Sequence, residues 1–169
     1  MLSNVKDELN RFAKYVISQS RANLTRGKKN SSKELYNSLK SNLNVSPNSF
    51  GLKFLMEDYG VFQDKGVSGK KVKYNTPFSY KDKMPPPSKM DKWIVRKGLK
   101  GTRDKEGRFI PRRSLQFMIA RSIFNKGIKP SMFFTKPFKK AFDNLPKDIV
   151  EAYKLDVEEL IKYTTNGNN

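Results

Sequence analysis

The first part of the chain carries apolar side chains at the spacing of a helix. Val5, Leu9, Phe12 and Val16 are separated by four, three and four positions, which predicts a helix over residues 3–24. Because these four residues share one face, that face has to be buried against another element.

Hydroxyl residues mark two helix starts in this region. Ser3 can cap the first helix by accepting a hydrogen bond from a backbone N–H of its first turn. Ser31 and Glu34 have the spacing of a capping box, which predicts a short helix that carries Leu35 and Leu39.

The next stretch alternates apolar and other residues with the period of a half-buried strand. The apolar positions are Phe50, Leu52, Phe54 and Met56. Asn42–Ser46 is the expected hairpin partner, joined to this strand through a turn at Pro47 and Asn48.

Helical spacing returns in the second half of the chain, where four more helices are predicted. They cover residues 88–97, which end before Gly98, residues 114–126, which end before Gly127, residues 135–142, and residues 146–163. The residues expected to be buried are Met90, Trp93, Ile94, Leu115, Met118, Ile119, Ile123, Phe138, Ala141, Phe142, Ile149, Tyr153, Val157, Leu160 and Ile161.

These elements predict an α+β fold in which a small antiparallel β-sheet is flanked by helices, with long basic loops between them. Length favours one domain over residues 1–163, with a mobile tail at 164–169. The loops at 66–87 and 99–113 are long for a compact domain, and loops of this length are usually functional or mobile.

Composition narrows the possible chemistry. The 169 residues include no cysteine and no histidine, which excludes disulfides, thiolate metal sites and Ser-His or Cys-His nucleophilic pairs. Carboxylate-plus-magnesium chemistry, Lys or Tyr acid–base chemistry, and no chemistry remain open. No apolar run is long enough for a membrane span and no signal peptide opens the chain, so we expect a cytoplasmic protein.

The charge is large and unevenly distributed. The chain has 35 Lys+Arg and 16 Asp+Glu, a net charge of +19. Residues 61–113 hold 16 basic and 5 acidic residues, whereas residues 143–163 hold 3 basic and 6 acidic residues. A field of this sign favours a polyanion, either nucleic acid or an acidic protein surface. The basic loop residues expected to face that partner are Lys70, Lys71, Lys73, Arg103, Arg112 and Arg113.

Motifs for catalysis or nucleotide binding are incomplete. The stretch Gly66–Lys71 lacks two requirements of a Walker A loop, because Asp64 stands where the first Gly belongs and Lys71 where Ser or Thr belongs. No Asp or Glu is followed by Lys two positions later, as metal-dependent nucleases of the restriction type require. The carboxylate pairs Glu57-Asp58 and Glu158-Glu159 are better explained as surface charge. We therefore predict no catalytic, metal-binding or cofactor-binding residue, and no enzyme.

Aromatic residues lie near the basic clusters, at Phe78, Tyr80, Trp93 and Phe109. Basic residues interleaved with aromatic rings can bind single strands by stacking. For Trp93 the preferred interpretation is a core residue, because it has helical spacing from Met90.

Three blocks in a fixed order resemble the tail-completion, or head–tail joining, family of tailed phages. They read MEDYGVFQDKGVSG at Met56–Gly69, PPPSKMDKWIVRKGL at Pro85–Leu99, and RSLQFMIARSIFNKGIKPSMFFTKPFKKAF at Arg113–Phe142. The residues that match the family pattern are Tyr59, Gly60, Phe62, Asp64, Gly66, Met90, Trp93, Ile94, Lys97, Gly98, Ala120, Ile123, Gly127, Phe133, Phe134, Pro137 and Phe138.

The resemblance covers residues 42–145 and implies a structural protein of the virion neck or tail, assembled in the host cytoplasm. It implies a homo-oligomeric ring, hexameric in this interpretation, that meets portal, connector or tail-tube proteins around the DNA path, without a membrane. A non-specific nucleic-acid-binding protein of phage or mobile-element origin is the alternative. The last helix adds a possible acidic interface between subunits, formed by Asp148, Glu151, Asp156, Glu158 and Glu159.

Overall fold

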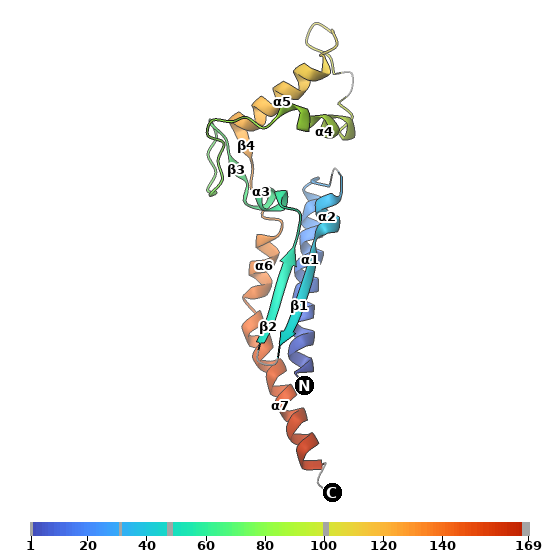
Figure 1. The fold of residues 1–169 in the computed structure, drawn as a ribbon, viewed down its shortest axis with the longest axis vertical. Helices are drawn as coiled ribbons and strands as arrows, with labels where there is room; N and C mark the ends of the chain where they lie inside the picture. Colours follow the sequence, from blue (N-terminus) through green and yellow to red (C-terminus); the bar gives the residue numbers. More distant parts are fainter. Residues whose placement is uncertain (1, 31, 47–48, 100–101, 167–169) are drawn as a thin grey trace. The chain divides into compact units, whose positions relative to one another are not determined.

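The computed structural model describes residues 2–30, 32–46, 49–99 and 102–166, drawn in Figure 1. Where the sequence predicts one domain, the chain forms two compact units. The helical unit comprises Met1–Arg26, Tyr36–Met56 and Phe133–Asn169, and the basic unit comprises Gly27–Leu35 and Glu57–Met132. The α+β class is confirmed, with a two-stranded antiparallel sheet in each unit.

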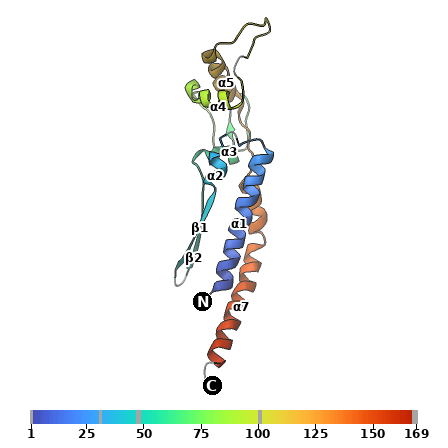
Figure 2. The same ribbon diagram turned by 90° about the vertical axis from the view of Figure 1, so that its right-hand side faces the viewer.

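The helical unit is built on two long helices, a β-hairpin and a short helix. Its elements are α1 (Ser3–Arg26), β1 (Lys40–Ser46), β2 (Ser49–Leu55), α6 (Thr135–Phe142) and α7 (Leu145–Asn166). Helix α7 runs alongside α1, and its last turns extend past the N-terminal end of α1 (Figures 1 and 2). Among the described residues of this unit, those last turns therefore have no neighbouring helix.

The apolar face of α1 is buried as predicted. Val5, Phe12 and Val16 are buried, and Leu9 is half-buried. Phe12 forms edge-to-face contacts with Phe54 of β2 and Phe138 of α6, at centroid distances of 6.1 and 5.7 Å. Each such ring pair adds about 0.5–1.5 kcal/mol beyond the burial of its area.

The predicted hairpin is confirmed. Strand β2 alternates between exposed and half-buried side chains, and β1 pairs with it antiparallel, with Leu43 opposite Leu52. The predicted turn at Pro47 and Asn48 lies outside the described residues.

The face predicted for α7 is wrong by part of a helical turn. Ala152 and Asp156 are its buried residues, whereas Tyr153, Leu160 and Ile161 are exposed. Close approach to α1 favours a small side chain at Ala152, and the larger apolar residues lie beside that seam. Residues 164–166, predicted as a mobile tail, continue α7, and 167–169 lie outside the described residues.

The basic unit has shorter elements. They are α3 (Tyr59–Lys65), β3 (Val67–Ser68), the 3-10 helix η1 (Pro87–Met90), α4 (Asp91–Arg96), α5 (Arg112–Lys126) and β4 (Gly127–Ile128). Helix α2 (Glu34–Ser38) crosses the boundary between the two units, and its expected capping residue Ser31 lies outside the described residues.

Two helices show further differences from the sequence prediction. Helix α5 buries Ala120 fully, and Leu115, Ile119 and Ile123 are half-buried around it, but Met118 is exposed. Phe142, at the end of α6, is also exposed. A helix covered on one side buries only a narrow stripe, so apolar residues at its margins remain in solvent.

Candidate functional site

The first basic loop is fixed to the end of α5 by backbone hydrogen bonds. The N–H groups of Lys70 and Lys71 donate to the carbonyl oxygens of Phe124 and Asn125, both at 2.9 Å. These carbonyls belong to the last turn of α5, whose C-terminal end carries a partial negative charge. The Nζ of Lys73 donates to the Gly69 carbonyl oxygen at 3.0 Å. The backbone of the predicted lysine cluster therefore supplies hydrogen-bond donors to the carbonyl groups at the C-terminal end of α5.

Glycines allow the backbones around β3 and β4 to meet. A Cβ added to Gly127, whose φ is +75°, would lie 2.1 Å from the carbonyl oxygen of Val67. A Cβ on Gly69 would lie 2.2 Å from the carbonyl oxygen of Asn125, and one on Gly66 would lie 2.6 Å from that of Ile128. The glycine-rich stretch that superficially suggests a phosphate loop thus serves close packing of the backbone.

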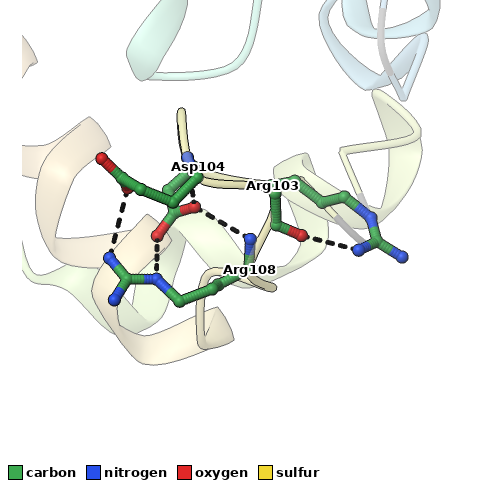
Figure 3. A network of polar contacts seen from close by, with 5 residues as sticks. Arg103, Asp104 and Arg108 are labelled. Carbon is green, nitrogen blue, oxygen red and sulfur yellow. Dashed lines mark hydrogen bonds and ion pairs between the residues drawn. The ribbon is translucent and has the colours of Figure 1, made fainter.

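The second basic loop is a small hairpin closed by polar contacts (Figure 3). The Gly107 N–H donates to the Asp104 carbonyl oxygen at 3.1 Å and closes a turn. The Asp104 carboxylate accepts the backbone N–H of Arg108 at 2.9 Å and its Nε at 2.8 Å. The hydrogen bond from the Arg108 backbone is the largest influence on the pKa of Asp104, which lies below its ordinary value.

Two of the three predicted arginines, Arg103 and Arg112, make contacts with other residues of the basic unit. The Arg103 guanidinium lies 3.9 Å from the ring centroid of Phe109. Arg112 of α5 forms a two-bond ion pair with Asp91 of α4, at 2.6 and 2.7 Å, and this bonding lowers the pKa of Asp91. Arg113 is exposed on the first turn of α5.

Trp93 was expected in the core, and this prediction is wrong. Its side chain is 41% exposed, whereas the next residue, Ile94, is 1% exposed. Helix α4 has only six residues, so it offers one fully buried position, and Ile94 occupies it. Among the matching motif residues Gly60 and Phe133 are buried, Gly98 ends the helix with φ +67°, and Tyr59 is exposed.

The predicted acidic face lies beside two acidic residues of α1. Asp148 and Glu151 of α7 line a hollow of about 440 Å³ together with Asp7 and Glu8. Arg11, at its edge, pairs with Glu8 at 2.6 Å. The remaining members differ in their surroundings, since Glu159 accepts a weak hydrogen bond from the Asn4 side chain at 3.4 Å and Glu158 is exposed.

Asp156 has a structural role that sequence reasoning did not find. Its carboxylate accepts the backbone N–H groups of Asn4 and Val5, at 3.0 and 3.1 Å, and so caps α1 from a distant part of the chain. Ser3 was expected to be this cap, but its hydroxyl instead donates to Asp156 at 3.4 Å. Burial raises the pKa of Asp156, but the hydrogen bonds outweigh it and the net pKa is below the ordinary value.

An aromatic cavity in the basic unit was also missed. It has a volume of about 550 Å³, and its main lining residues are Tyr59, Phe62, Gln63, Pro77, Phe78 and Tyr80. Phe62 and Phe78 meet edge to face with their centroids 4.7 Å apart. Burial raises the pKa of Tyr80. Phe62 and Phe78 lie too far apart in the sequence for a local periodic pattern to relate them, although the aromatic residues themselves are evident in the sequence.

In the ranges that the structure covers, no three residues of the types His, Cys, Asp and Glu gather in a metal-binding arrangement. No described helix is both long enough and apolar enough to cross a membrane. Comparisons with protein-family models, with curated proteins and with solved structures found no match.

Proposed function

We propose that the chain is a structural subunit of the head–tail joint of a tailed bacteriophage, where its copies form a sixfold ring around the DNA path. Two independent features support the proposal. One is the ordered set of three sequence blocks that resemble the tail-completion family. The other is an exposed apolar surface on α7, which is the observation that carries the assembly role.

This surface, the α7 stripe, consists of Val150, Tyr153, Leu160 and Ile161, each 50–55% exposed. Steps of three, seven and one place these residues on one side of the helix, with the half-buried Val157 among them. Spacing of this kind is what a packed helix presents to a neighbour. In a chain of 30% charged residues, a continuous apolar stripe indicates a contact surface with another protein.

The acidic face supplies the second element of an assembly contact. A closed ring brings two unlike faces of neighbouring copies together, and copies with a net charge of +19 repel one another. The acidic residues around Asp148 and Glu151 are opposite in charge to the basic unit, which has 22 basic and 8 acidic residues and a net charge of +14. Complementary charge of this kind sets orientation more than affinity.

The α7 stripe can be tested with a triple variant, Tyr153→Ser, Leu160→Ser and Ile161→Ser. We expect a folded monomer in sedimentation, and phage particles whose heads and tails remain separate in a complementation assay. The matched control, Lys154→Ser with Lys162→Ser, changes exposed residues of the same helix and should assemble normally. In particles made with the unaltered chain, a labelled antibody should mark the neck. Normal assembly of the triple variant, or labelling elsewhere, would contradict the proposal.

Non-specific nucleic-acid binding is the second candidate function, and the charge of the basic unit favours it. Neutralising phosphates releases counterions, so the logarithm of the affinity should fall linearly with the logarithm of the salt concentration. A binding assay across a salt series tests this, and a flat dependence would exclude it.

A further inference from the structure

We propose that the aromatic cavity of the basic unit binds an unpaired base of single-stranded nucleic acid. Its volume of about 550 Å³ is within the usual range for small-ligand sites. The rings of Phe62, Phe78 and Tyr80 provide the apolar, polarisable walls on which planar bases stack in sites of this class. This proposal rests on the second candidate function, nucleic-acid binding, and adds to it the place where the nucleic acid binds and its single-stranded form.

Gln63 provides an observation that points to a ligand with a hydrogen-bond acceptor. It lines the cavity, and its side-chain Nε2 is buried without a hydrogen-bond partner. An unsatisfied buried donor is costly and uncommon in folded proteins. A nucleobase carries carbonyl and ring-nitrogen acceptors on its edges, so a base held in the cavity can satisfy this donor once the Gln63 amide turns toward it.

Charge distinguishes nucleic acid from an uncharged ligand. Lys81 also lines the cavity, and it belongs to a unit whose net charge is +14. A nucleotide combines a planar ring with a phosphate on each repeat, which matches an aromatic cavity in a basic surrounding. A single strand can turn a base outward without breaking a pair, whereas a duplex first has to open.

The direct test compares single-stranded and duplex oligonucleotides of about 12 nucleotides by fluorescence anisotropy of the full chain. At equal numbers of phosphates, the single strand should bind more tightly. Replacing Phe62 by Ala removes a stacking surface and should weaken single-strand binding by roughly 5- to 150-fold. Because stacking releases no counterion, the slope of affinity against salt should not change. Phe117→Ala, which alters an exposed ring on α5, is the matched control and should bind like the unaltered chain.

A second variant separates binding from folding. Gln63→Leu removes the buried donor without leaving a partner unsatisfied, so its melting temperature should be equal or higher. Its affinity for the single strand should nevertheless fall. A fluorescent base analogue placed in the strand should lose emission with the unaltered chain but not with Phe62→Ala.

Three outcomes would overturn the proposal. Equal affinity for duplex and single strand would mean that phosphates alone are recognised, which would leave the second candidate function intact. Unchanged binding by both Phe62→Ala and Gln63→Leu would place the contact elsewhere. Competition by an acidic aromatic peptide, stronger than by the oligonucleotide, would identify a protein segment as the ligand.

Discussion

The two units of this chain differ in what stabilises them. The helical unit, with 13 basic and 8 acidic residues, buries apolar faces of long helices and joins them through a cluster of phenylalanines. The basic unit has a charge of +14, α-helices of six to fifteen residues and strands of two. Its loops are fixed largely by backbone hydrogen bonds and by contacts at glycine.

This difference determines how each unit should respond to substitution. Apolar packing is spread over many side chains, so the helical unit should lose stability in proportion to the area removed. The backbones approach so closely at Gly66, Gly69 and Gly127 that there is no room for a Cβ atom. The stability of the basic unit should therefore depend on these few positions. Since those contacts involve no side-chain charge, its surface can carry many lysines and arginines.

The largest effect is expected for Gly127→Ala. The added Cβ would lie 2.1 Å from the Val67 carbonyl oxygen, and the backbone there has φ +75° and ψ −166°, a region that is essentially restricted to glycine. Strain and overpacking together should cost about 3–5 kcal/mol. Hydrogen exchange should accelerate in the basic unit more than in the helical unit.

Gly107→Ala is the matched control for this prediction. Gly107 also has positive φ, +80°, but a Cβ there would meet nothing within 4 Å. It should therefore cost only the strain of the left-handed conformation, about 1 kcal/mol. Equal losses in the two variants would show that close packing around Gly127 is unimportant.

The next effect concerns the helical unit. Asp156→Ala removes the acceptor of the Asn4 and Val5 N–H groups and should cost about 1–3 kcal/mol in chemical unfolding. Glu158→Ala, at an exposed position of the same helix, should change stability little. A loss shared equally by both variants would mean that the cap contributes nothing specific.

The cap also predicts a pH dependence. Because the pKa of Asp156 is lowered by folding, its contribution is complete above the unfolded value of about 3.9. The contribution is lost as the pH falls through the lower, folded pKa. Stability measured from pH 5 downward should therefore decline less steeply in Asp156→Asn than in the unaltered chain. Parallel curves would contradict the assignment.

Local patterns predicted the elements well, and long-range contacts explain what was missed. The alternation around Phe54 and the helical spacing around Phe12 are properties of neighbouring residues, so both were predicted. The buried seam of α7 depends on α1, whose close approach and unpaired N–H groups favour Ala152 and Asp156 over the larger apolar residues. The aromatic cavity depends in the same way on Phe62 and Phe78, which folding brings together.

A smaller effect is expected at Trp93. Because this side chain is exposed, Trp93→Ala should cost about 1–2 kcal/mol rather than the 3–5 kcal/mol of a core tryptophan. Ile94→Ala, one residue away and fully buried, should cost more, about 2–5 kcal/mol. As Trp93 is the only tryptophan, a soluble quencher such as acrylamide should reduce the emission of the native chain readily. A larger loss of stability in Trp93→Ala than in Ile94→Ala would indicate that Trp93 is a core residue.

The smallest effect on stability, but not on assembly, is expected when Glu151, Glu158 and Glu159 are all replaced by Lys. These residues are exposed, and exposed ion pairs contribute about 0–1 kcal/mol each, so the monomer should remain folded. The substitutions raise the net charge by six, from +19 to +25, and remove the acidic surface that could face a basic neighbour.

If acidic α7 faces a basic unit in the ring, assembly should fail at low salt and recover partly at high salt, where screening shortens the range of repulsion. The variant with Gln at the same three positions should show a weaker defect, since it loses attraction without adding repulsion. Normal particle completion by the Lys variant at low salt would mean that the acidic face is ordinary surface, and that contacts between copies, if present, depend on the α7 stripe alone.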